Sequence, residues 1–201
     1  MSLPPEHSRA LLLTARVAPD DLAPFTALRD RFFPPARNYL PAHITLFHQL
    51  PQAALDELTV ALAAGVAATA PFTVGVLPPV SLGRGVAYPV EARRLQQLRR
   101  PLRERFDPLL TEQDRRPWKR PHLTVQNKVT VEEARRLLRH LTYRYRSCQL
   151  RIEGLEVHRY DGGPWTLLAT HLFPPAAPPP VPPSENVGAA RTFVEKQADD
   201  R

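Results

Sequence analysis

An internal repeat restricts the possible folds of this 201-residue chain more than any other feature of its sequence. Leu28-Arg-Asp-Arg-Phe-Phe-Pro34 matches Leu102-Arg-Glu-Arg-Phe-Asp-Pro108, which lies 74 positions later. A loop follows each copy, and Pro41-Ala-His-Ile-Thr-Leu46 then matches Arg120-Pro-His-Leu-Thr-Val125, at an offset of 79. Because repeated sequence at a fixed offset indicates repeated structure, we expect two pseudo-symmetric halves, at about residues 10–82 and 84–174.

The apolar pattern predicts the same order of elements, β-α-β-α-β, in both halves. In the first half the expected strands and helices cover residues 10–17, 22–32, 43–50, 52–70 and 72–77. In the second half they cover residues 86–91, 95–106, 122–129, 132–145 and 150–158, and one additional strand covers residues 166–173. We expect Asp20 or Asp21 to cap the first helix, and Pro101 to kink or split the third. The predicted fold class is α+β, with helices outside one or two mixed sheets.

Prolines mark the end of the folded part. Of the 24 prolines in the chain, many lie in the run Pro174–Pro183, and a polar stretch follows to Arg201. Proline has no amide donor and a fixed φ, so this run cannot form a regular helix or a central strand. We therefore expect one domain over residues 1–174 and a flexible or polyproline-like tail over 175–201.

Composition excludes several classes of protein. The longest nearly apolar stretch, Val60–Ala70, is much shorter than the roughly 20 residues that span a bilayer. A single cysteine, Cys148, cannot form an internal disulfide, and no Cys/His spacing typical of a zinc site is present. We expect a cytoplasmic monomer with no membrane partner and no metal. The net charge of +7 is compatible with phosphate-bearing partners but does not identify one.

The two His-x-Thr segments are the strongest candidates for a functional site. Side chains alternate along a strand, so His43 and Thr45 share one face while their apolar neighbours share the other. His122 and Thr124 have the same arrangement in the second half. On one strand the two side chains start about 6.6 Å apart, so one phosphate group can contact both. The duplication predicts that the two His-Thr pairs face one groove.

Two opposed imidazoles can cleave a phosphodiester without a metal ion. One neutral histidine takes a proton from the attacking water or hydroxyl, and the other, protonated, donates a proton to the departing oxygen. Histidine suits both roles because its ordinary pKa of about 6.5 allows both forms near neutral pH. The threonine hydroxyls can donate hydrogen bonds to the non-bridging oxygens, where charge collects in the transition state.

Taken together, His43-Ile-Thr-Leu46 and His122-Leu-Thr-Val125 in repeated halves resemble the paired motifs of the two-histidine (2H) phosphoesterase superfamily. The segment from Leu40 to His48 is most similar to the branch of 2′-5′ RNA ligases and 2′,3′-cyclic phosphodiesterases. The resemblance covers about residues 10 to 174. It implies a bilobal α+β fold with antiparallel or mixed sheets around a central groove, and no cofactor. It also implies a catalytic pair, His43 and His122, and phosphate-binding residues Thr45 and Thr124. It also implies a substrate, RNA or a nucleotide with a 2′,3′-cyclic phosphate or a 2′-5′ linkage.

Three further residues are candidates for substrate binding. Phe47 has the strand parity of His43, so its ring could stack on a base, although a core position fits an aromatic residue equally well. Lys119 and Arg120 precede the second motif and could contact a phosphate, or could be ordinary solvated charges.

Two other functions remain open at the level of sequence. The chain could bind RNA or a nucleotide with little turnover, although all four histidine and threonine positions are intact. It could also be a scaffold that recruits partners through the proline-rich tail. The repeat favours an enzyme, because metal-independent acid–base chemistry needs two proton-transfer groups and the repeat supplies two.

Overall fold

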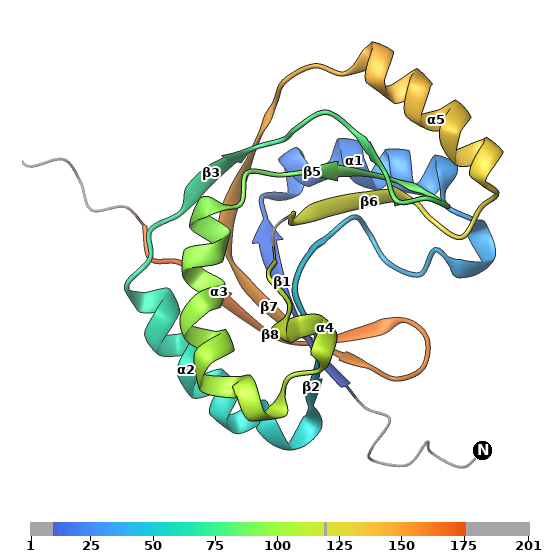
Figure 1. The fold of residues 1–201 in the computed structure, drawn as a ribbon. Coiled ribbons are helices and arrows are strands. Elements are labelled where there is room, and N and C mark those ends of the chain that lie inside the picture. The colour runs from blue at the N-terminus through green and yellow to red at the C-terminus, as the bar shows by residue number, and fades with distance from the viewer. Residues whose placement is uncertain (1–9, 119, 176–201) are drawn as a thin grey trace, which may run out of the picture.

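A computed structural model describes residues 10–118 and 120–175 of the chain (Figure 1). Lys119 and the expected tail beyond Pro175 lie outside the described residues, so the predicted limits of the domain and of the tail stay predictions. The described part has the expected α+β architecture, with curled antiparallel sheets that form a half-barrel.

The larger sheet has the strand order β2-β1-β7-β3, and β8 pairs with the C-terminal part of β7. Its strands are β1 (Ala10–Val17), β2 (Ile44–Pro51), β3 (Phe72–Gly75), β7 (Gln149–Tyr160) and β8 (Trp165–Leu172). Every pairing between the described strands is antiparallel. These ranges agree closely with the predicted strands, because each is a short apolar run between turn residues.

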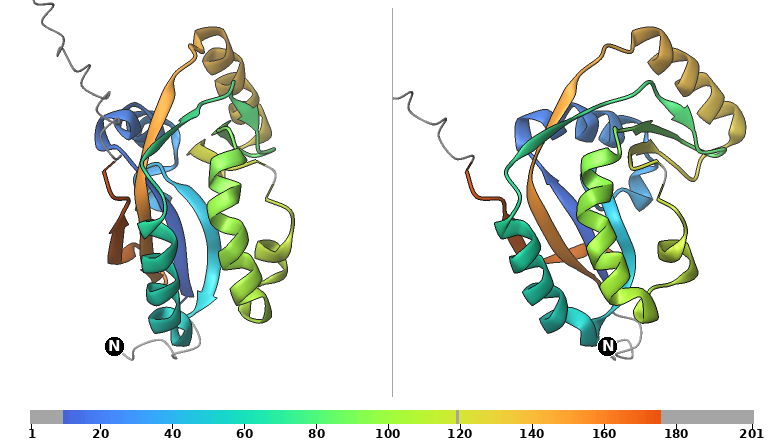
Figure 2. Two further views of the ribbon diagram at one scale, coloured as in Figure 1. Left: turned by 90° about the vertical axis from the view of Figure 1, so that its left-hand side faces the viewer. Right: turned by 60° about the vertical axis from the view of Figure 1, so that its left-hand side comes forward.

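A smaller sheet carries the second His-x-Thr segment. Its strand order is β4 (Val80–Ser81), β5 (Val86–Pro89) and β6 (His122–Gln126). The chain after β3 pairs with the chain after β5, through a bridge between Val76 and Val90. The equivalent pairing in the larger sheet is that of β7 with β1. The two halves therefore exchange strands, and each half contributes strands to both sheets. The exchange is visible where β7 crosses from the α5 end of the molecule into the larger sheet (Figures 1 and 2).

Helices surround the sheets. They are α1 (Pro19–Phe32), α2 (Leu55–Ala67), α3 (Arg93–Phe106), α4 (Glu112–Arg115) and α5 (Val131–Arg144). Single 3-10 turns cover Pro35–Arg37, Gln52–Ala54 and Asp107–Leu109. The helix α1 packs on β6 of the other half, and α5 contacts β4 and β5.

Two local predictions for the helices are wrong. The N-cap of α1 is Ala18, with Pro19 in the first turn, and no side chain caps the helix. Asp21 instead accepts a hydrogen bond from the backbone N–H of Arg151 at 2.8 Å, so its carboxylate joins the helix to β7. Helix α3 continues through Pro101, so the predicted split is wrong, and the predicted kink stays a prediction. Tertiary packing holds these segments in place and overrides the local preference of the residues.

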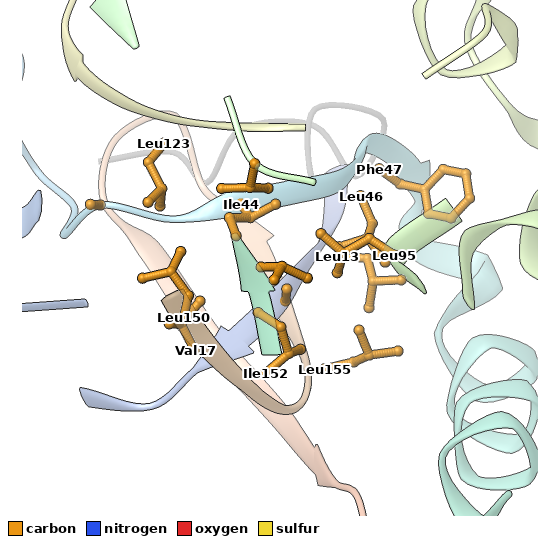
Figure 3. Close-up of a cluster of buried hydrophobic side chains, with 14 of the residues drawn as sticks. Leu13, Val17, Ile44, Leu46, Phe47, Leu95, Leu123, Leu150, Ile152 and Leu155 are labelled. Atoms are coloured by element: carbon orange, nitrogen blue, oxygen red, sulfur yellow. The ribbon is translucent and has the colours of Figure 1, made fainter. Parts of the chain in front are cut away.

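The core lies between the sheets and the helices. Ile44 and Leu46 of β2 and Leu123 and Val125 of β6 are fully buried, as the alternation of side chains predicts. Figure 3 shows Ile44, Leu46 and Leu123 among leucine, isoleucine and valine side chains from β1, β7 and α3. Burial of each such side chain stabilises the fold by about 1.5–3 kcal/mol. The core therefore fixes which face of each motif strand is left for histidine and threonine.

Two buried arginines connect the halves. Arg29 of α1 donates from Nη1 to the carbonyl of Thr124 at 3.0 Å and from Nε to the carbonyl of Leu40 at 3.0 Å. Arg99 of α3 donates from Nε to the carbonyl of Leu46 at 2.8 Å and from Nη2 to the carbonyl of Asp114. A helix of each half thus binds the backbone of the motif strand in the other half.

We predict that Arg99→Met destabilises the protein by about 2–4 kcal/mol, because two buried carbonyls lose a charged donor. Chemical denaturation followed by circular dichroism measures this change. The matched control is Arg100→Met, which alters the adjacent, exposed arginine of the same helix and should change the free energy of unfolding by less than about 0.5 kcal/mol. Equal destabilisation by the two variants would contradict a connecting role for Arg99.

Candidate functional site

The two motif histidines are held in the same way. Nδ1 of His43 lies 2.8 Å from the carbonyl of Pro41, and Nδ1 of His122 lies 2.9 Å from the carbonyl of Arg120. A carbonyl oxygen only accepts, so Nδ1 carries the hydrogen in both rings. In the neutral form of each histidine, Nε2 is then the nitrogen with the lone pair. Both imidazoles are partly exposed, so this nitrogen is available for proton transfer.

The motif threonines occupy equivalent positions two residues later. Thr45 pairs with Thr14 of β1, and Thr124 pairs with Ala87 of β5. Both threonines are partly exposed, and neither hydroxyl hydrogen-bonds to another group within residues 10–118 and 120–175. Each hydroxyl can therefore donate to a ligand without first breaking a protein contact.

Packing places the two motif strands next to each other. Strands β2 and β6 are in contact, and Arg29 binds backbone carbonyls on both sides of this contact. A pocket of about 230 Å³ adjoins His43 alone among the four motif residues. The structure therefore brings the strands together and places His43 at the wall of a pocket.

The pocket beside His43 has an aromatic wall and a polar wall. The ring of Trp165 lies 4.7 Å from the ring of His43, measured between centroids, and 5.6 Å from the ring of His158. His158 Nε2 is 3.0 Å from Thr14 Oγ1 and 3.5 Å from Glu156 Oε2. The carboxylate of Glu156 also accepts from Arg16 at 2.6 Å.

The electrostatics of this pocket favour a neutral His43 beside an ionised Glu156. Burial lowers the pKa of His43 to about 4, although the Pro41 carbonyl acts in the opposite direction, and nearby Arg29 and His158 lower it further. The hydrogen bond from His158, followed by that from Arg16, keeps the pKa of Glu156 below its usual value. At neutral pH His43 is therefore in the form that accepts a proton.

The three predicted substrate-binding residues have different outcomes. Phe47 is 0% exposed, faces Leu13 in the core and lies under the guanidinium of Arg99, 4.5 Å from ring centroid to Cζ. A register irregularity in the pairing of β1 with β2 breaks the alternation that placed Phe47 beside His43. This burial argues against stacking on a base. Arg120 is exposed and stays a candidate, and Lys119 is outside the described residues.

Sequence reasoning missed the residues that complete the pocket. The sequence predicts only a packing role for Trp165, and no spacing pattern marks His158 or Glu156. The sequence pattern that could have revealed them is the alternation of side chains along β7, which places Glu156 and His158 on the same face of the strand. The β7–β8 hairpin then returns the chain so that Tyr160 pairs with Trp165, which brings the indole to the same end of the strand.

Among the described residues, no group of three or more histidine, cysteine, aspartate or glutamate side chains is arranged to hold a metal ion. Within the same residues, no helix combines the length and the apolar character needed to cross a membrane.

A comparison of the sequence with models of protein families identifies the family of this chain. The model of the 2′-5′ RNA ligase superfamily matches residues 17–164, which include both His-x-Thr segments and most of the pocket beside His43. The chain belongs to the 2′-5′ RNA ligase superfamily. Membership of this 2H phosphoesterase superfamily supports an RNA-related phosphoesterase activity. No curated protein is significantly similar to the chain in sequence.

Solved structures of the 2′-5′ RNA ligase superfamily share the fold at low identity. TT0787 of Thermus thermophilus is 19% identical, with a TM-score of 0.58, and the match covers 84% of this chain and 100% of that one. LigT of E. coli complexed with 3′-AMP is 18% identical, with a TM-score of 0.53, and the match covers 82% of this chain and 98% of that one. At these identities the comparison establishes the fold alone.

We predict that the stability of this superfamily member falls as the pH is lowered from about 6.5 to about 4. In that interval the unfolded chain protonates His43 at its ordinary pKa of about 6.5, whereas the folded protein does not. His43→Asn removes this term, so its melting temperature should depend less on pH over the same interval. Differential scanning calorimetry between pH 4 and pH 8 measures both proteins. Parallel curves over the whole range would contradict the burial of a neutral His43.

Proposed function

We propose that the protein is a metal-independent phosphoesterase that acts on RNA-type phosphodiesters with two histidines as acid and base. The reaction is hydrolysis of a 2′,3′-cyclic phosphate, reversible 2′-5′ ligation, or both. The proposal includes a cytoplasmic monomer that needs no cofactor. Superfamily membership supports the general activity, and the 3′-AMP bound in the LigT structure supports a nucleotide substrate.

One observation carries the proposal: both histidines have the same restrained tautomer. The bonds from Nδ1 to the carbonyls of Pro41 and Arg120 fix the orientation of each ring and direct proton exchange to Nε2. A structural histidine has no need for this arrangement in two separate strands. Acid–base catalysis does need it, because each proton must be transferred at a defined position.

The setting of His43 supports a division of roles. His43 is neutral at pH 7 because burial lowers its pKa, so we assign it as the base that takes a proton from water. His122 then carries the proton that is donated to the departing ribose oxygen. In-line attack places the incoming and departing oxygens on opposite sides of phosphorus, so one histidine cannot serve both. In the ligating direction the two roles exchange.

Threonine and tryptophan side chains complete the substrate site. The unpaired hydroxyls of Thr45 and Thr124 donate to the non-bridging oxygens, whose charge increases in the transition state. Trp165 supplies an aromatic surface beside His43, on which the base of a nucleotide stacks. In this proposal the guanidinium of Arg120, an exposed residue, binds a further phosphate.

We predict that His43→Ala and His122→Ala each lower kcat for a 2′,3′-cyclic nucleotide by about 10²–10⁴-fold. The double variant should be far less impaired than the product of the single effects, because the two residues act as a unit. The dependence of kcat/KM on pH should be bell-shaped, with the acid limb absent in His43→Ala and the alkaline limb absent in His122→Ala.

Threonine variants provide a graded comparison. Thr45→Ala and Thr124→Ala should each lower kcat by about 10–10³-fold, since each removes one donor. The matched control is Thr142→Ala, at an exposed position of α5, which should keep wild-type turnover. Near-full activity of either histidine variant on every cyclic nucleotide and 2′-5′ linked oligonucleotide tested would refute the paired acid–base mechanism.

A second prediction concerns metal ions. Turnover should be unchanged after exhaustive treatment with EDTA, because proton transfer and hydroxyl donors take the place of the ions that activate water in metal-dependent phosphoesterases. Rates before and after chelation, with Mg²⁺, Mn²⁺ or Zn²⁺ restored separately, test this. A loss on chelation that one of these ions reverses would rule out the proposed mechanism.

A further inference from the structure

A second and larger pocket lies between the C-terminal end of α1 and helix α5. Its volume is about 620 Å³, within the range typical of small-molecule sites. It shares no lining residue with the pocket beside His43. None of the residues that line it takes part in the proposed acid–base chemistry.

The wall of this second pocket contains a buried polar group without a partner. Gln126, the last residue of β6, is 6% exposed, and its Oε1 forms no hydrogen bond within the described residues. Buried amides are almost always hydrogen-bonded, because an unpaired one has lost its contacts with water. Gln126 lines the pocket, so a rotation of its side chain can bring the unpaired amide oxygen to a molecule bound there.

The rim of the pocket is basic. Arg31 and Arg136 line it, both are exposed, and neither forms a salt bridge in the part of the chain that the structure describes. Glu133 also lines the pocket, but its carboxylate accepts from the backbone N–H and hydroxyl of Thr130 in a capping box. The two arginines can therefore bind an anion without breaking an ion pair. His140 also lines the pocket, and its imidazole can donate or accept a hydrogen bond.

Apolar side chains supply the remaining walls. Phe32 and Phe33 of the α1 end and Leu137 of α5 line the pocket. One face of the Phe33 ring is covered by the Arg29 guanidinium, 4.0 Å from the centroid to Cζ, whereas Phe32 is only partly buried. The guanidinium of Arg31 lies 5.2 Å from the Phe32 centroid, so the charged rim adjoins the apolar wall. A molecule with a flat ring next to an anion can contact both.

We propose that this second pocket binds one nucleotide, with the base against Phe32 and the Gln126 amide and the phosphate on Arg31 and Arg136. Nucleotides combine a flat apolar ring, a hydrogen-bonding edge and an anion, and the pocket offers a partner for each. Gln126 lies in the same strand as His122 and Thr124, so an occupant contacts the strand that carries the second motif. The nucleotide is either a free mononucleotide or one unit of an RNA chain.

Equilibrium dialysis of AMP against the full-length chain tests this proposal. We expect two AMP molecules per chain, one in each pocket. Arg136→Gln should weaken one of the two binding events about tenfold, because a charged hydrogen bond to phosphate is lost. Gln126→Leu should weaken the same event. The matched control, Arg139→Gln, changes an exposed arginine of α5 that does not line the pocket and should bind as the wild type does.

The outcomes distinguish this site from the proposed phosphoesterase site. If the pocket beside His43 takes no AMP, the wild type binds one AMP, and that event is still weakened by Arg136→Gln. Adenosine and inorganic phosphate should each bind at least tenfold more weakly than AMP. AMP binding that is unchanged in both Arg136→Gln and Gln126→Leu would overturn the proposal, as would phosphate binding as tightly as AMP.

Competition separates the two sources of the nucleotide. A single-stranded RNA pentanucleotide that displaces AMP at lower concentration than AMP itself, and does so less well in Arg136→Gln, indicates a unit of an RNA chain. Equal or weaker displacement indicates a free mononucleotide. Both results support a nucleotide site, and failure of both AMP and the pentanucleotide to bind there would exclude it.

Discussion

The contacts of two buried arginines with strand carbonyls are the constraint on which the rest of this fold depends. Arg29 and Arg99 reach from helices into the opposite half and bind the backbone near each His-x-Thr segment. A guanidinium suits this position because its planar set of donors satisfies several carbonyls at once and its charge strengthens each bond. The motif strands are therefore held by their backbones, which leaves the histidine and threonine side chains free for a substrate.

How well the sequence predicts each feature depends on how far apart in the chain the interacting residues lie. Strand alternation depends on adjacent residues, so Ile44, Leu46 and the histidine–threonine face could be read directly from the chain. The buried arginines could not, because Arg99 and Arg100 are adjacent arginines of one helix and only tertiary partners distinguish buried Arg99 from exposed Arg100. Phe47 shows the limit of alternation, since one register irregularity moved its ring from the expected groove into the core.

The candidate site likewise has one part that the sequence shows directly and another part that it does not. The groups that we propose to be reactive lie in two short motifs that the sequence shows directly, whereas the walls of the pocket come from strands that are distant in the sequence. Glu156 and His158 reach the site because β7 pairs with β1, and Trp165 reaches it through a hairpin. The Nδ1 contacts of the two histidines involve backbone carbonyls, which carry no residue-specific signal. Low identity to TT0787 and LigT is compatible with this division, because one fold can carry different walls around its reactive groups.

The exchange of strands between the halves has a consequence for the origin of the molecule. Neither half contains a complete sheet, so a chain of one half would cover its strands only by associating with a second copy, as in a domain-swapped dimer. Fusion of two copies replaces that encounter with a tether and a high effective concentration. After fusion, the residues around the two histidines no longer have to be identical. A symmetric dimer would surround both with the same residues, whereas here β8 and its tryptophan follow β7 but only the short β4 follows β3. Asymmetry of this kind allows two copies of one histidine to stand among different neighbours, as His43 does beside Trp165.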